Sequence, residues 1–108
     1  MRSPPDAGTV LGVDLGGTTT KAGRLRIGTT ELAGFRTRPT GAARSREDVL
    51  EDVAGDVRAL AAEADGPVVA VGIGVPAALT PDGRIDVLPN FAPGWRGLFA
   101  FRPRPGPT

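Results

Sequence analysis

The first residues that could carry chemistry lie in the sequence VDLGGTTTK, at residues 13–21. An Asp at the end of an apolar strand points its carboxylate out of the sheet, and two glycines let the backbone turn tightly and approach a ligand. Such a turn can hold a phosphate through backbone N–H groups, while a Lys adds a compact positive charge and an Asp anchors magnesium or its water ligands. The residues predicted to do so are Gly16, Gly17, Thr18, Lys21 and, at the metal, Asp14.

A purely structural role for this turn stays open. The pattern is neither the P-loop nor the dinucleotide-binding fingerprint, because both need a helix directly after the glycines and a strand is expected here. A β-hairpin with Gly-Gly in its turn is common without any ligand. Substituting Gly17 by Val distinguishes the two interpretations. In a plain turn the substitution lowers only the stability of the fold, whereas in a phosphate site it also abolishes nucleotide binding.

The second stretch of interest is GIGVPAALTPDGRIDVLPNFAPGW, at residues 72–95. Gly72 and Gly74 end an apolar strand, a place where ligands collect in open α/β sheets. Asn90 and Trp95 belong to a loop and could orient a sugar by hydrogen bonding and stacking. Alternatively, the glycines only admit close helix packing and Trp95 covers the edge of the core.

The composition narrows the chemistry that 108 residues can support. There is no Cys and no His, which excludes disulfides, zinc fingers, thiol nucleophiles and histidine bases, so any metal would need hard oxygen ligands. The net charge of +1 argues against a dedicated nucleic-acid surface, and 40% apolar residues favour one globular unit despite 16 Gly and 11 Pro. No apolar run approaches the roughly 20 residues of a membrane span, and no signal core is present. We therefore expect a cytoplasmic protein without nucleic-acid or membrane partners.

The first part of the chain predicts an antiparallel meander of three strands. Apolar and β-branched residues favour strands at 9–14, 18–26 and 29–38. Gly16-Gly17 and Gly28 mark tight connections between them.

A helix is predicted next. Ser45 followed by Asp48 approximates a capping box, and apolar residues recur at helical spacing from Val49 to Ala64, before Gly66-Pro67 stops the helix. Its acidic residues are expected to form a solvated face. These are Glu47, Glu51, Asp52, Asp56 and Glu63.

The strand expected at 68–75 is apolar at nearly every position, which is typical of a strand buried on both faces. We expect it to lie parallel beside the strand at 9–14, because a helix of this length is the usual crossover. A turn is predicted at 80–84, a short strand just after it, and a loop at 89–97.

In this order, VDLGGTTTKAG, the capped helix and VGIGVPAALTPDGRIDVLPNFAPGW resemble the amino-terminal portion of the ROK family. That family comprises bacterial sugar kinases, glucokinases and sugar-responsive repressors. The resemblance covers residues 9–97 and implies an α/β fold, a truncated ribonuclease-H-like half-domain of the actin and hexokinase type with a mixed sheet in β-β-β-α-β order. Residues 1–8 are then a disordered lead-in, and residues 98–108 an irregular tail rich in Pro and Arg.

The resemblance carries over to two groups of residues. Those that match the family's phosphate-binding turn are Asp14, Gly16, Gly17, Thr18 and Lys21. Those that match its sugar site are Gly74, Val75, Pro76 and Asn90, with Trp95 in the same region. Ala77 stands where the family usually has Gly, a departure that bears on backbone contacts to the hexose.

The function implied is transfer of the γ-phosphoryl group of MgATP to a hexose such as glucose. The family's general base is an Asp in an Asn-Asp-Ala-Asn stretch, and its zinc site uses His and Cys; neither is in this sequence. We therefore assign no catalytic residue and expect the chain to be inactive alone, as an amino-terminal fragment. The half-fold should also expose an apolar inter-lobe face through which copies self-associate.

Two alternatives come from other classes of protein. One is the remnant of a ROK-family transcriptional regulator without its DNA-binding domain, since only 13 residues precede Asp14. The other is an unrelated small α/β domain in which Gly-Gly is merely a hairpin turn.

Overall fold

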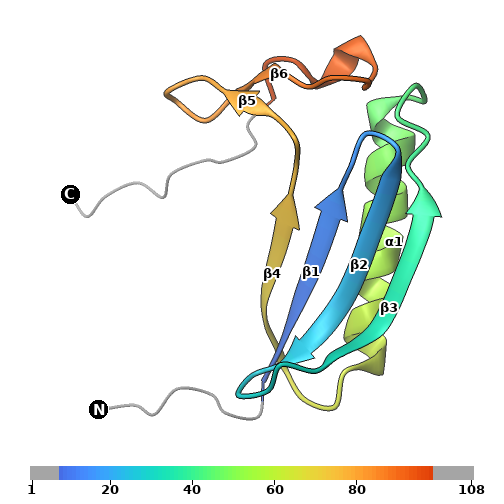
Figure 1. Ribbon diagram of the computed structural model, residues 1–108, viewed down its shortest axis with the longest axis vertical. Helices are drawn as coiled ribbons and strands as arrows, with labels where there is room; N and C mark the ends of the chain where they lie inside the picture. The colour runs from blue at the N-terminus through green and yellow to red at the C-terminus, as the bar shows by residue number, and fades with distance from the viewer. Residues whose placement is uncertain (1–7, 99–108) are drawn as a thin grey trace.

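The computed structural model describes residues 8–98. Apart from Gly8 and Leu98, the expected lead-in (residues 1–8) and tail (residues 98–108) lie outside the described residues. A sheet is covered on one face by a helix, with a small β-ribbon beyond one end of the sheet (Figure 1). The elements are β1 (Thr9–Leu15), β2 (Thr19–Arg26), β3 (Leu32–Pro39), α1 (Arg46–Glu63), β4 (Val68–Gly74), β5 (Ala78–Leu79), β6 (Ile85–Val87) and a 3-10 turn (Pro93–Trp95).

The topology confirms the predicted α/β fold with its mixed sheet. The strand order is β3-β2-β1-β4, in which β1, β2 and β3 pair antiparallel and β4 lies parallel to β1. The connection through α1 is the expected crossover. β5 and β6 form a separate antiparallel ribbon, so the short strand expected after the turn is confirmed and gains a partner that was not predicted.

The turn between β2 and β3 is longer than predicted. Gly28 has φ +86°, and the N–H and hydroxyl of Thr29 both donate to the carbonyl of Arg26. Because residues 29–31 are used in closing this turn, β3 begins at Leu32 and not at Thr29.

The helix begins where the sequence predicts. The Ser45 hydroxyl accepts the N–H of Asp48 at 3.1 Å, as a capping residue should. Val49, Val53 and Leu60 are buried in one cluster with the apolar side chains of β1. Within residues 8–98, no helix combines the length and apolar character needed to cross a membrane.

The prediction that β4 is buried on both faces is wrong. Six of its seven residues are exposed. The exposure of β4 has two physical causes. β4 lies at the edge of the sheet, and α1 packs against β1 and β2 and leaves β4 uncovered (Figure 1). An unbroken apolar run therefore marks a strand here without marking how deeply that strand is covered.

The acidic residues of α1 were also predicted to be uniformly solvated, and Asp56 is an exception at 3% exposure. Its carboxylate accepts a hydrogen bond from Arg38 on β3. Glu63 binds Arg24 at 3.0 Å and Arg36 at 2.8 Å, one through each carboxylate oxygen. Arginines on the sheet thus meet carboxylates on the helix along their shared interface.

Arg44, in the segment before α1, extends this pattern. Its guanidinium donates to Asp52 at 2.6 Å, and this hydrogen bond lowers the pKa of the Asp52 carboxyl below its usual value. The ion pairs therefore join α1 both to the sheet and to the segment that precedes the helix.

Replacing Arg38 by Ala should destabilise the fold by about 2 kcal/mol, because it leaves the buried Asp56 carboxylate without its partner. Chemical denaturation measures this free energy. Arg36→Ala is the matched control, since Glu63 is 43% exposed and keeps Arg24, and its cost should stay below about 1 kcal/mol. Equal losses in the two variants would contradict a special role for the buried pair.

Candidate functional site

Three of the predicted site residues form a row across the sheet. Asp14, near the end of β1, pairs with Lys21 on β2 and with Gly74 on β4. The row lies on the face opposite α1, because Val13 and Leu15 are buried toward the helix and successive residues of a strand alternate. Residues 53 positions apart in sequence, Lys21 and Gly74, therefore flank one carboxylate.

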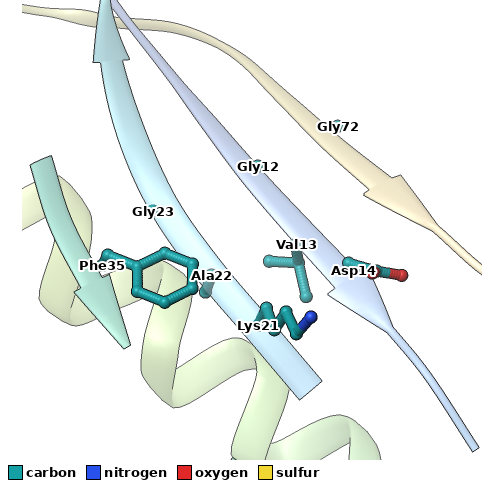
Figure 2. A pocket seen from close by; sticks show the side chains of 8 residues that line it. All are labelled: Gly12, Val13, Asp14, Lys21, Ala22, Gly23, Phe35 and Gly72. Carbon is teal, nitrogen blue, oxygen red and sulfur yellow. The ribbon is translucent and has the colours of Figure 1, made fainter. Parts of the chain in front are cut away.

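A shallow hollow of about 380 Å³ adjoins this row. Figure 2 shows Asp14 and Lys21 on neighbouring strands, with the bare backbone positions of Gly12 and Gly72 beside them and the Phe35 ring at the far side. A Cβ added at Gly12 or Gly72 would meet no atom within 4 Å, so the surface next to Asp14 is open. Neither Asp14 nor Lys21 forms a side-chain ion pair within residues 8–98, and both side chains are exposed.

The β1–β2 turn gives its two glycines different roles. The N–H of Gly16 donates to the carbonyl of Thr19 at 3.1 Å, and a Cβ on Gly16 would lie 2.6 Å from that same oxygen. Gly16 is therefore required by the turn, and its N–H is already used there. The N–H groups of Gly17 and Thr18 form no backbone hydrogen bond within residues 8–98, so they are the remaining amide donors for a ligand.

Thr40, which follows β3, holds the turn in place and was not predicted as a site residue. It is 2% exposed, its N–H donates to the carbonyl of Thr18 at 2.9 Å, and its hydroxyl donates to the carbonyl of Gly16 at 2.7 Å. The Thr40 and Thr20 hydroxyl oxygens lie 2.7 Å apart. A hydroxyl has one proton, so Thr20 must be the donor to Thr40. No local pattern distinguishes Thr40 from the other threonines of the chain.

Asn90 lies directly beside the turn. A Cβ on Gly17 would be 3.4 Å from the Asn90 side-chain nitrogen and 3.5 Å from its Cβ. The loop that carries Asn90 is anchored by the N–H of Ala92, which donates to the carbonyl of Ala42 at 2.9 Å. The segment from Thr40 to Ala42 thus contacts both the turn and the Asn90 loop.

Other predicted sugar-site residues lie apart from the row. Val75 and Trp95 pack into the apolar cluster behind it, while Pro76 is exposed in the connection to β5. Trp95 is 4% exposed and meets Phe91 edge-on, with ring centroids 5.2 Å apart. The arrangement is the alternative in which Trp95 covers the core, because a ring so deeply buried has no face free for stacking.

The donor set suits a phosphate with its magnesium ion. Within residues 8–98, no three His, Cys, Asp or Glu side chains come together to hold a metal. Asp14 is a single exposed carboxylate, and magnesium commonly takes one or two carboxylates with phosphate oxygens and water as its other ligands. The residues present fit such an ion only together with a phosphate ligand.

No family model matches the chain, and no curated protein matches it. Solved structures do. A ROK hexokinase from Thermus thermophilus is 30% identical with a TM-score of 0.65, over 82% of this chain and 28% of that one. An inorganic polyphosphate/ATP-glucomannokinase from Arthrobacter sp. strain KM is 29% identical with a TM-score of 0.69, over 84% and 37%. A ROK family glucokinase from Streptomyces griseus, solved with glucose and AMPPNP, is 25% identical with a TM-score of 0.67, over 85% and 28%.

The chain therefore matches an amino-terminal portion of ROK-family glucokinases and hexokinases and spans 28% to 37% of the length of these three relatives. This confirms the resemblance inferred from the sequence and the half-domain fold that it implies.

Replacing Thr40 by Val should destabilise the fold by about 1–3 kcal/mol, because the part-buried Gly16 carbonyl and the buried Thr20 hydroxyl lose their partner while the side-chain volume hardly changes. Urea denaturation followed by circular dichroism measures the loss. Thr37→Val, at an exposed position of β3, is the control and should change stability by less than about 0.5 kcal/mol. A Thr40→Val protein as stable as this control would remove Thr40 from its positioning role.

Proposed function

We propose that this chain is the phosphate-binding lobe of a ROK-type, ATP-dependent sugar kinase, similar to a glucokinase. The observation that carries the proposal is the row of Lys21, Asp14 and Gly74 beside the β1–β2 turn. The structural likeness to ROK kinases supports this proposal. One of these kinases, the glucokinase from Streptomyces griseus, was solved with glucose and an ATP analogue.

Each residue of the turn has a separate task in this proposal. The N–H groups of Gly17 and Thr18 bind phosphate oxygens, and Lys21 neutralises phosphate charge. Asp14 holds magnesium or its water ligands. When bound, MgATP supplies the γ-phosphoryl group. Gly16 contributes by shaping the turn, since its own N–H is engaged with Thr19.

The sugar side of the proposal rests on Gly74 and Asn90. Gly74 adjoins Asp14 without a side chain, and Asn90 lies against Gly17, so both are near the proposed phosphate position. A side-chain amide both donates and accepts hydrogen bonds, which suits a sugar hydroxyl. In this proposal Val75 and Pro76 contact the sugar through their backbone and not through their side chains. The Val75 side chain is not available, because it packs against the core.

We further propose that the 108-residue chain binds nucleotide but does not transfer phosphate by itself. Phosphoryl transfer depends on holding the donor and the acceptor in line from opposite sides. The residues described here border the proposed site from one side, at the carboxyl ends of β1 and β4.

Nucleotide binding tests the first part of the proposal. Isothermal titration of MgATP should give weaker binding for Gly17→Val by about tenfold or more, because the new side chain enters the space beside Asn90 where the phosphate must approach. Gly17→Ala, whose Cβ makes only ordinary contacts, keeps the fold and should also weaken binding.

The control for this titration is Gly55→Ala, on the open surface of α1, which should bind like the parent and be slightly more stable. If Gly17→Ala and Gly17→Val lose stability while MgATP binding stays the same as in the parent, the turn is structural and the proposal fails.

A coupled assay with MgATP and glucose tests the second part. We expect no turnover above the background of a protein-free reaction. Turnover that disappears in Gly17→Val would refute the claim that the chain cannot transfer phosphate by itself. The same result would support the phosphate site. The two parts of the proposal can therefore fail separately.

A further inference from the structure

Arg44 binds the backbone of the segment that holds the β1–β2 turn. Its Nη2 carries two N–H bonds and donates to the carbonyl of Thr40 at 2.8 Å and to the carboxylate of Asp52 at 2.6 Å. The Nε and the backbone N–H of Arg44 both donate to the carbonyl of Gly41, at 3.3 Å and 2.9 Å. One residue thus joins two consecutive carbonyls of this segment to a carboxylate on α1.

Gly41 gives the Arg44 side chain room to approach the backbone so closely. The φ of Gly41 is +63°, a conformation that residues with a side chain rarely adopt. A Cβ added there would lie 2.5 Å from the Arg44 Nε, so a side chain at this position would displace the guanidinium. The contact of Arg44 with residues 40 and 41 therefore depends on the glycine between them and the helix.

Asp52 is also held from a second direction, by the sheet. Its other carboxylate oxygen lies 3.8 Å from Nη1 of Arg38, and Nη2 of Arg38 binds the buried carboxylate of Asp56. Asp52 therefore balances the charge of Arg44 while it is itself fixed between two arginines. This arrangement suits a residue that orders its neighbours, since the Arg44 guanidinium already has a carboxylate partner.

We propose that Arg44 is a positioning residue for the β1–β2 turn and that it acts through Thr40. Arg44 binds Thr40 at its carbonyl, and Thr40 in turn binds the turn through its N–H and its hydroxyl. Loss of Arg44 then shifts residue 40 and, with it, the N–H groups of Gly17 and Thr18. The effect on nucleotide affinity rests on the proposed function, whereas the effect on the turn does not.

Backbone amide NMR of the full 108-residue chain without nucleotide tests the positioning directly. The amide signals of Gly17 and Thr18 should shift in Arg44→Ala and remain at their parent positions in Arg58→Ala. Arg58 is the matched control, because it also binds an α1 carboxylate, that of Glu51 at 3.0 Å, and both of these side chains are exposed. Within residues 8–98, neither of them forms a hydrogen bond with the turn.

Variants of Asp52 separate positioning from a general loss of stability. Asp52→Ala leaves Arg44 in the chain but removes its anchor, so it should shift the same turn signals. Asp52→Asn keeps an oxygen that accepts the Arg44 N–H and should restore the signals toward their parent positions. Arg44→Lys keeps the positive charge beside Asp52 but loses the planar fork that reaches a carbonyl and a carboxylate together, so the signals should shift in it as well.

Isothermal titration with MgATP then connects the turn to its proposed ligand. Arg44→Ala and Arg44→Lys should weaken binding by about fivefold, whereas Asp52→Asn and Arg58→Ala should bind like the parent. Unchanged Gly17 and Thr18 signals in both Arg44 variants overturn the inference, and a loss of affinity without such a shift assigns Arg44 to direct contact with the phosphate. If the signals shift but the parent protein binds no MgATP, the positioning by Arg44 stands and the proposed function fails.

Discussion

The parallel pairing of β1 with β4 is the constraint on which the rest of the molecule depends. Two parallel strands that follow a meander need a connection that crosses the sheet, and α1 is that connection. Because α1 packs against β1 and β2 and reaches β3 through its carboxylates, it buries Leu11, Val13 and Leu15 and leaves the opposite face and β4 open. The same pairing sets Gly74 beside Asp14. The position of the core, the arrangement of the candidate site and the exposure of β4 thus all follow from this parallel pairing.

The segment after β3 joins the two halves of the candidate site. Thr40 holds the β1–β2 turn through its N–H and hydroxyl, and Ala42 accepts the N–H that anchors the Asn90 loop. The β1–β2 turn and the Asn90 loop, which are distant in sequence, are therefore both hydrogen-bonded to the same buried segment. The segment contributes no group to the proposed ligand, but the relative position of Gly17 and Asn90 depends on it.

Local signals made much of the fold predictable. The Ser45 cap, the helical spacing and the turn glycines each act over a few residues, and each gave an element close to its observed position. Asp14, Gly17 and Lys21 could be proposed as site residues because residue types and spacing typical of a phosphate-binding turn lie close together in the sequence. The exposure of β4 was not predictable, since it depends on how far α1 extends over the sheet. Nor was the burial of Asp56, whose partner Arg38 is supplied by the register of β3.

Asp14 and Lys21 are directly paired residues of a continuous ladder, while Gly17, Thr18 and Asn90 belong to loops. The positive and the negative side chain are therefore attached to directly paired strands, and their backbone separation is set by the hydrogen bonds of the β1–β2 ladder. If the proposed MgATP binds here, its phosphate and metal meet two side chains whose backbone spacing is already ordered, and binding restricts chiefly the turn and the Asn90 loop. Selectivity can then vary through the loops without disturbing the distance between the two charges.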